Sequence, residues 1–98
     1  MDVEFDNDDL DKLETDKTFK MGLSDALVNA YRKRVQSIRA APDERTLAAV
    51  RGNKFEKLKG NRSHQHSMRL NNQYRLIMEI KKGNPSNVIV IVGVEDYH

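Results

Sequence analysis

The sequence has no cysteine, and it has no hydrophobic run long enough for a membrane helix. Without cysteine, the chain can form neither a disulfide nor a thiolate metal site. A membrane-spanning helix needs about 20 mainly apolar residues, and no stretch comes near that length. The acid-rich first residues are the opposite of the basic start of a secretory signal. These absences lead us to expect a cytoplasmic protein that has no contact with membranes.

Internal repeats and low-complexity linkers are also missing from the chain. Its 98 residues are enough for one small domain with an adequate but modest core. We therefore predict a single domain over residues 1–98.

The charges are distributed unevenly, although the net charge is only +2. Residues 1–16 hold eight acids and one base, which gives −7, and residues 17–98 hold 16 bases and seven acids, which gives +9. A basic body of this kind suits a polyanion such as nucleic acid. The acidic segment is either an ordinary solvated helix or lies against the basic surface.

The first half of the chain predicts one short strand and three helical stretches. Residues 3–5 alternate between apolar and charged side chains, as a strand does. Asn-Asp at 7–8 can cap a short helix. Ser24 is a good N-cap for the clearest helix, which we expect to continue to about Ala40. One or two further helical turns are expected over residues 44–50.

After residue 52 the periodicity changes from helical to strand-like. Strands are predicted over residues 55–58, 66–70, 74–80 and 88–92, with turn-forming residues between them. Helices followed by strands that hairpins connect predict the α+β class. The expected architecture is a small twisted antiparallel sheet with the N-terminal helices packed on one face.

The register of the central hairpin has a chemical consequence. Pairing Leu70 with Tyr74 across a three-residue loop sends the apolar side chains of both strands to one face. The same pairing sends Arg69 and Arg75 to the other face. Two arginines on a sheet face are commonly no more than solvated charges, so this pair alone does not define a site.

The last four residues follow directly after the most apolar predicted strand. Glu95, Asp96, Tyr97 and His98 place an acid, a phenol and an imidazole where a core strand can hold them. The alternative is a polar tail that only solvates this strand. Arginines that converge with Asp, Tyr and His are better explained as a phosphate site.

The other two histidines are expected to be structural. His66 falls on the core-facing side of its strand, and His64-Gln65-His66 superficially suggests a metal site. No third ligand stands at a suitable spacing, so neither a metal nor another cofactor is expected.

The second half of the chain resembles HigB-type toxins of the RelE superfamily. The resemblance rests on Asn53–Arg62 (NKFEKLKGNR), on Gln65–Leu76 (QHSMRLNNQYRL) and on the final Asp-Tyr-His. In the first half only the layout of elements agrees. The family fold is a small twisted antiparallel sheet with helices on one side, which matches the expectation from the residues themselves.

The resemblance implies a function. Toxins of this family are metal-independent endoribonucleases that cut messenger RNA, usually in the decoding site of a ribosome. Each is neutralised by an antitoxin, which for HigB-type toxins is a helix-turn-helix (HigA-type) protein. The expected partners are therefore this antitoxin, messenger RNA on the ribosome, and ribosomal RNA.

The resemblance also suggests roles for residues at matching positions. Asp96, Tyr97 and His98 match the terminal functional residues of the family, and Arg75 matches the arginine after an aromatic residue. These four are the predicted catalytic residues. Glu56 stands where some relatives have a histidine, so it is a candidate acid or base. Contacts to RNA phosphates are expected from Lys57, Lys59, Arg62 and Arg69.

A wider basic surface is expected to contact ribosomal RNA. It would be formed by Arg32, Lys33, Arg34, Lys54, Lys57 and Arg62.

RNA cleavage without a metal uses the 2′-hydroxyl of the RNA as the nucleophile. It needs a base, cations around the phosphate and an acid for the leaving oxygen. His98 suits either proton-transfer role, and Asp96 either orients it or is itself the base. The alternative reading is a non-catalytic module with the same fold that binds RNA or an antitoxin. A DNA-binding repressor is disfavoured, because no helix-turn-helix pattern is visible.

Overall fold

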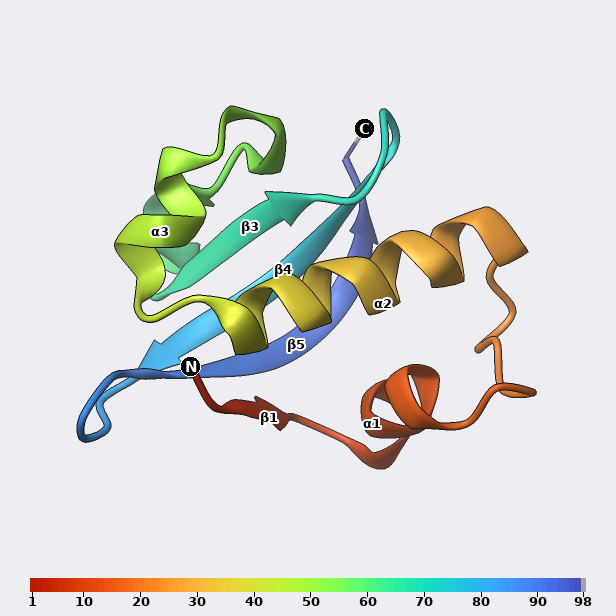
Figure 1. The fold of residues 1–98 in the computed structure, drawn as a ribbon. Coiled ribbons are helices and arrows are strands. Elements are labelled where there is room, and N and C mark those ends of the chain that lie inside the picture. Colours follow the sequence, from red (N-terminus) through yellow and green to blue (C-terminus); the bar gives the residue numbers. More distant parts are fainter. Residues whose placement is uncertain (98) are drawn as a thin grey trace.

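The computed structural model describes residues 1–97, in which three α-helices accompany a five-stranded sheet (Figure 1). The strand order is β1-β5-β4-β3-β2. In chain order the elements are β1 (Val3–Phe5), α1 (Asp8–Thr15), α2 (Asp25–Ala40), α3 (Glu44–Ala49), the 3-10 turn η1 (Arg51–Asn53), β2 (Glu56–Lys57), the 3-10 turn η2 (Gly60–Arg62), β3 (Gln65–Arg69), β4 (Tyr74–Lys81) and β5 (Val88–Asp96).

The helices begin at side-chain caps. The Asn7 side chain accepts a hydrogen bond from the N–H of Leu10 at 3.0 Å, and Ser24 Oγ accepts one from the N–H of Leu27 at 3.2 Å. Asp43 caps α3 in the same way, through two N–H groups of its first turn. These side chains satisfy donors that the first turn of a helix cannot satisfy itself. Both helix starts predicted from sequence are therefore found where expected.

The sheet is mixed, with one parallel pair at its edge. Strands β2 to β5 pair antiparallel, as predicted, while β1 runs parallel to β5. All the helices and the other strands separate β1 from β5 in sequence, so no hairpin fixes their relative direction. The α+β class predicted from sequence is confirmed, and the parallel edge pair is a feature that the sequence analysis did not anticipate.

The predicted register of the central hairpin is confirmed. The N–H of Leu70 donates to the carbonyl of Tyr74 at 3.0 Å, and Arg69 lies opposite Arg75. Met68 and its neighbours on the same face are buried against the helices. Because successive side chains of a strand alternate between faces, both arginines lie on the face turned away from the core.

Strand β5 extends four residues beyond its predicted end. The sequence pattern weakens after residue 92, but Glu95 lies opposite Arg75 and Asp96 lies opposite Tyr74. The long partner strand β4 supplies these positions, so backbone pairing continues where the apolar pattern stops. The extension brings the end of β5 beside the β3–β4 turn (Figure 1).

The core lies between the helices and one face of the sheet. Its buried side chains come from all three helices and from β3, β4 and β5. Tyr31 of α2 is fully buried and donates its hydroxyl hydrogen to the carbonyl of Leu10 in α1 at 2.7 Å. Among the helices of residues 1–97, none is long and apolar enough to cross a membrane.

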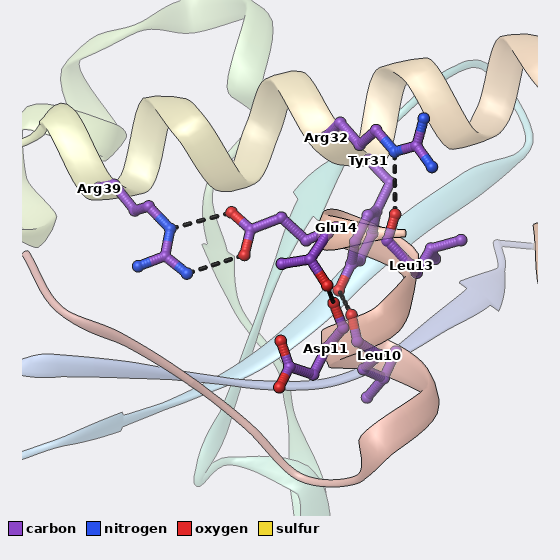
Figure 2. A network of polar contacts seen from close by, with 8 residues as sticks. Leu10, Asp11, Leu13, Glu14, Tyr31, Arg32 and Arg39 are labelled. Carbon is purple, nitrogen blue, oxygen red and sulfur yellow. Dashed lines mark hydrogen bonds and ion pairs between the residues drawn. The ribbon is translucent and has the colours of Figure 1, made fainter. Parts of the chain in front are cut away.

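The acidic helix α1 packs on α2 through polar contacts as well (Figure 2). Arg39 donates from Nε and Nη2 to the two carboxylate oxygens of Glu14, at 2.9 and 2.8 Å. These hydrogen bonds raise the pKa of the Arg39 guanidinium. Asp8, Asp9 and Asp11 remain exposed while Glu14 pairs with Arg39, so the acidic helix has features of both arrangements that the sequence left open.

Candidate functional site

Arg75 is a buried cation on the sheet face turned away from the core. Only 6% of its surface is exposed. The same face carries Ser67 and Ile77, and Glu95 of the neighbouring strand lies opposite Arg75. A buried charge is costly unless it is paired and hydrogen-bonded, so the contacts of Arg75 define this site.

The guanidinium of Arg75 is fixed from one side. Its Nη2 donates to the carbonyl of Lys54 at 2.9 Å and to Ser67 Oγ at 3.0 Å. A carboxylate oxygen of Glu56 lies 3.7 Å from the same nitrogen. The hydrogen bonds of Arg75 to the described residues all come from Nη2, and its Nε is buried without a partner there. The group is therefore held in place while Nη1 remains available to a ligand.

Tyr97 covers Arg75. The centre of its ring lies 4.8 Å from Cζ of Arg75, a cation–π distance, although 61% of Tyr97 is exposed. The N–H of Tyr97 donates to the carbonyl of Gln73 at 2.6 Å, and the Gln73 side chain donates to Asp96 Oδ2 at 3.0 Å. The terminal segment is thus fastened to the β3–β4 turn. The prediction for His98 lies outside the described residues.

Arg75 and Tyr97 stand between two hollows. The first, which we call the cationic hollow, has a volume of about 220 Å³ and is also lined by Lys54, Glu56, Arg69, Asn71 and Asn72. The second, which we call the mixed hollow, has a volume of about 210 Å³ and is also lined by Leu58, Arg62, Ser67, Ile77, Glu95 and Asp96. One hollow therefore offers mainly cations and amides, whereas the other combines aliphatic side chains with charged ones.

An ion pair borders the mixed hollow. Arg62 donates from Nη1 and Nη2 to the two carboxylate oxygens of Glu95, at 3.0 and 2.7 Å. Its Nε donates to the side-chain oxygen of Gln65 at 3.0 Å. The bonds to Glu95 raise the pKa of the Arg62 guanidinium. Arg62 therefore reaches the site, but with its charge already paired.

The other predicted phosphate contacts are placed differently. Arg69 lines the cationic hollow and donates to the side chain of Asn72. Lys57 lies opposite His66 and so projects from the other face of the sheet. Lys59 lines neither hollow. Of the cations expected to contact RNA, the structure brings Arg69 and Arg62 to Arg75 and leaves Lys57 and Lys59 outside this group.

Sequence reasoning missed several residues that complete the site. Ser67 and the carbonyl of Lys54 fix Arg75, and Gln73 fastens the terminal segment. Lys54 was expected only in the wider basic surface. Ser67 stands two residues before Arg69, so strand alternation already placed its side chain on the face of the arginines. Gln73 could be found only by continuing the β4–β5 pairing past residue 92.

The remaining histidines line neither hollow. His66 is half-buried and stacks on Phe55, with ring centres 5.1 Å apart. Burial, with a smaller contribution from Lys57, lowers its pKa. His64 is exposed, 3.8 Å from Glu79. Within residues 1–97, no group of three His, Asp or Glu side chains is arranged to hold a metal ion.

Comparison with known proteins identifies the fold and the family. The fold is that of a RelE-like toxin: the YoeB/ParE toxin from Agrobacterium tumefaciens superposes with a TM-score of 0.68, at 15% identity, over 100% of both chains. The family model described as the RelE-like toxin of type II toxin-antitoxin system HigB matches residues 3–98. The chain belongs to this HigB-like toxin family. No curated protein matches it.

Family membership confirms the resemblance seen in the second half of the sequence and extends it over nearly the whole chain. The protein is the toxin of a type II toxin–antitoxin system, so an antitoxin is its partner. RelE-like toxins are in general ribonucleases.

Proposed function

We propose that this chain is a metal-independent endoribonuclease that cuts messenger RNA in the decoding site of the ribosome. The observation that carries the proposal is the buried guanidinium of Arg75. It is fixed by Lys54 and Ser67, faced by Glu56 at 3.7 Å and covered by the Tyr97 ring. A fixed cation between a carboxylate and an exposed aromatic ring is suited to an RNA phosphate and its neighbouring base.

In the proposed reaction the RNA supplies its own nucleophile. A base removes the proton of a 2′-hydroxyl, and the resulting oxygen attacks the adjacent phosphorus. The bond from phosphorus to the 5′-oxygen breaks, and an acid gives that oxygen a proton. The products are a 2′,3′-cyclic phosphate and a 5′-hydroxyl, so no metal and no external nucleophile are required.

The roles follow from position. Glu56 lines the cationic hollow beside Arg75, which makes it the candidate base. Asp96 accepts a hydrogen bond from the Gln73 side chain and orients the terminal segment. We assign protonation of the leaving oxygen to His98, on the strength of the family resemblance. Arg75 stabilises the charge that develops on the phosphate, a contribution of about 3 kcal/mol for a comparable donor.

The proposed contact with the ribosome rests on charge, and the proposed type of antitoxin rests on family membership. The net charge of +9 on residues 17–98 favours a surface of ribosomal RNA. Arg69 and Lys54, which line the cationic hollow, add to that field at the site. We further propose that the antitoxin partner is a helix-turn-helix protein, as it is for HigB-type toxins.

The test is the appearance of new RNA 5′ ends. Purified chain is added to a translating extract and to the same messenger RNA without ribosomes, and cuts are mapped by primer extension. The chain lacking Tyr97 and His98 is compared with Lys81→Gln, which removes an exposed ion pair to Glu4. We expect ribosome-dependent cuts from the wild type and from the control, and none from the truncated chain.

Toxicity without RNA cleavage would instead favour the alternative, a non-catalytic binding module. If expression of the full and the truncated chain slows growth equally and no new 5′ ends appear, the nuclease proposal is wrong. A binding module of the same fold then accounts for the toxicity.

A further inference from the structure

The mixed hollow has an apolar floor beside the proposed phosphate site. Ile77 is 3% exposed and lies two residues after Arg75, so both side chains project from the same face. Leu58 is half-buried and lines the same hollow. On the neighbouring strand, Gly93 lies opposite Ile77. A Cβ at Gly93 would have no atom within 4 Å, so this position has room for a side chain.

The walls of this hollow supply stacking and hydrogen bonding. Tyr97 lines the hollow and is 61% exposed. The carboxylate of Glu95 also lines it and is held by the two bonds from Arg62. Each carboxylate oxygen has a second lone pair and can accept a further hydrogen bond. Three of the five N–H groups of Arg62 already donate to Glu95 and Gln65, and the carboxylate of Glu95 is an acceptor that this wall offers.

The volume limits the size of the occupant. At about 210 Å³ the hollow is smaller than the pockets of about 300 Å³ or more that take drug-sized ligands. It suits a single flat ring system. An apolar floor, an aromatic side and polar acceptors at the edge are the features that bind an unstacked base.

We propose that the mixed hollow binds the base of a nucleotide adjoining the phosphate held by Arg75, and that it prefers bases with an exocyclic amino group to uracil. Adenine, cytosine and guanine carry an amino group that donates to a carboxylate such as Glu95. Uracil has no amino group, and its hydrogen-bonding edge carries two carbonyl oxygens around a single N–H. This inference rests on the proposed RNA-cutting function and names the base subsite of the same centre.

The direct test is binding of mononucleotides, observed by NMR at the methyl groups of Leu58 and Ile77. The wild-type chain is titrated with AMP, CMP, GMP, UMP and ribose 5-phosphate. We expect both methyl signals to shift with the first three nucleotides, and UMP to bind on the order of tenfold more weakly. Equal shifts with ribose 5-phosphate, or no shift with any nucleotide, would overturn the proposal.

Two variants test the geometry. Gly93→Val adds a side chain opposite Ile77, at a position where a Cβ meets no atom within 4 Å, so the fold should tolerate it. It should abolish the nucleotide shifts while leaving the response of Tyr97 to inorganic phosphate. Unchanged nucleotide shifts in this variant would refute the subsite.

Glu95→Gln should reduce the difference between CMP and UMP to less than about threefold, since it replaces the accepting carboxylate. The matched control is Glu4→Gln, because Glu4 is similarly exposed and also forms an ion pair, with Lys81. We expect the control to keep the wild-type preference. A Glu95→Gln chain that also keeps it would contradict the assignment of Glu95.

The readout does not depend on cleavage, so the two proposals fail separately. Cleavage of messenger RNA without nucleotide shifts at Leu58 and Ile77 would overturn the base subsite and leave the nuclease standing. Nucleotide shifts without cleavage on ribosomes would support the subsite and overturn the nuclease.

Discussion

Replacing Arg75 by lysine separates the charge of the site from its geometry. Both side chains carry one positive charge, but only the planar guanidinium can bond Lys54 and Ser67 from one nitrogen and still present Nη1 to a phosphate. If the fixed geometry of the guanidinium is required for cleavage, this charge-conserving change should lower the cleavage rate strongly.

The change should have two separate effects, one on turnover and one on folding stability. Loss of an oriented donor to a developing negative charge lowers turnover by about 10²–10³-fold. Loss of the bond to Ser67, which is only 2% exposed, leaves a buried hydroxyl unpaired and costs about 1–3 kcal/mol of folding stability. For a domain of this size, each kcal/mol lowers Tm by about 4–8 °C. The variant should therefore be less stable but still folded.

The assay measures both quantities on the same protein. Cuts in messenger RNA on ribosomes are quantified by primer extension. Tm is measured by circular dichroism during a temperature scan that starts well below the transition. Arg69→Lys is the matched control, because Arg69 lies opposite Arg75 on the same face but is less buried. It should retain most of the activity.

Ser67→Ala provides the structural comparison, since it removes the same buried hydrogen bond and keeps the guanidinium. We expect it to lower Tm about as much as Arg75→Lys while reducing cleavage far less. If folded Arg75→Lys cuts within about threefold of the wild type, the argument from guanidinium geometry is refuted.

Changes at three further residues test other parts of the structure. Tyr97→Phe keeps the ring over Arg75 and should retain activity within a few-fold, whereas Tyr97→Ala should lose stacking worth about 1–3 kcal/mol in ribosome-dependent cleavage. His66→Gln should flatten the dependence of stability on pH. Burial lowers the pKa of His66 in the folded chain, so between its ordinary pKa of about 6.5 and the lowered value the unfolded chain binds more protons. The free energy of unfolding of the wild type should therefore fall as pH decreases through this range in urea titrations. Tyr31→Phe removes the buried bond to the Leu10 carbonyl and should cost about 0.5–1.5 kcal/mol in the same titrations.

Each of these expectations has an outcome that would contradict it. A Tyr97→Phe chain as inactive as Tyr97→Ala would assign the role to the hydroxyl instead of the ring. A His66→Gln chain with an unchanged pH profile would remove His66 as its cause. A Tyr31→Phe chain as stable as the wild type would mean that the bond to Leu10 contributes nothing net.

Local signals were sufficient for most of the fold. Asn7 and Ser24 cap their helices because a short polar side chain satisfies the N–H groups of the first turn, whatever the rest of the chain does. The register of Leu70 and Tyr74 follows from burial, since a slip of one residue would send charged side chains into the core. These features depend on neighbours in sequence.

The end of β5 and the direction of β1 depend on distant partners. Backbone pairing with β4 extends β5 to Asp96, although the residues after 92 carry no strong strand pattern. The parallel pairing of Val3–Phe5 with β5 joins the two ends of the described chain, so no hairpin fixes its direction. Neither feature is encoded in a local pattern.

For the site, the sequence by itself determined which residues are chemically able to act and that both arginines share the face away from the core. The tertiary structure alone decided that the carbonyl of Lys54 fixes Arg75 and that Gln73 fastens the terminal segment. The physical reason is that alternation along a strand is a local rule. Contact between residues 20 or more positions apart requires the whole sheet to be assembled.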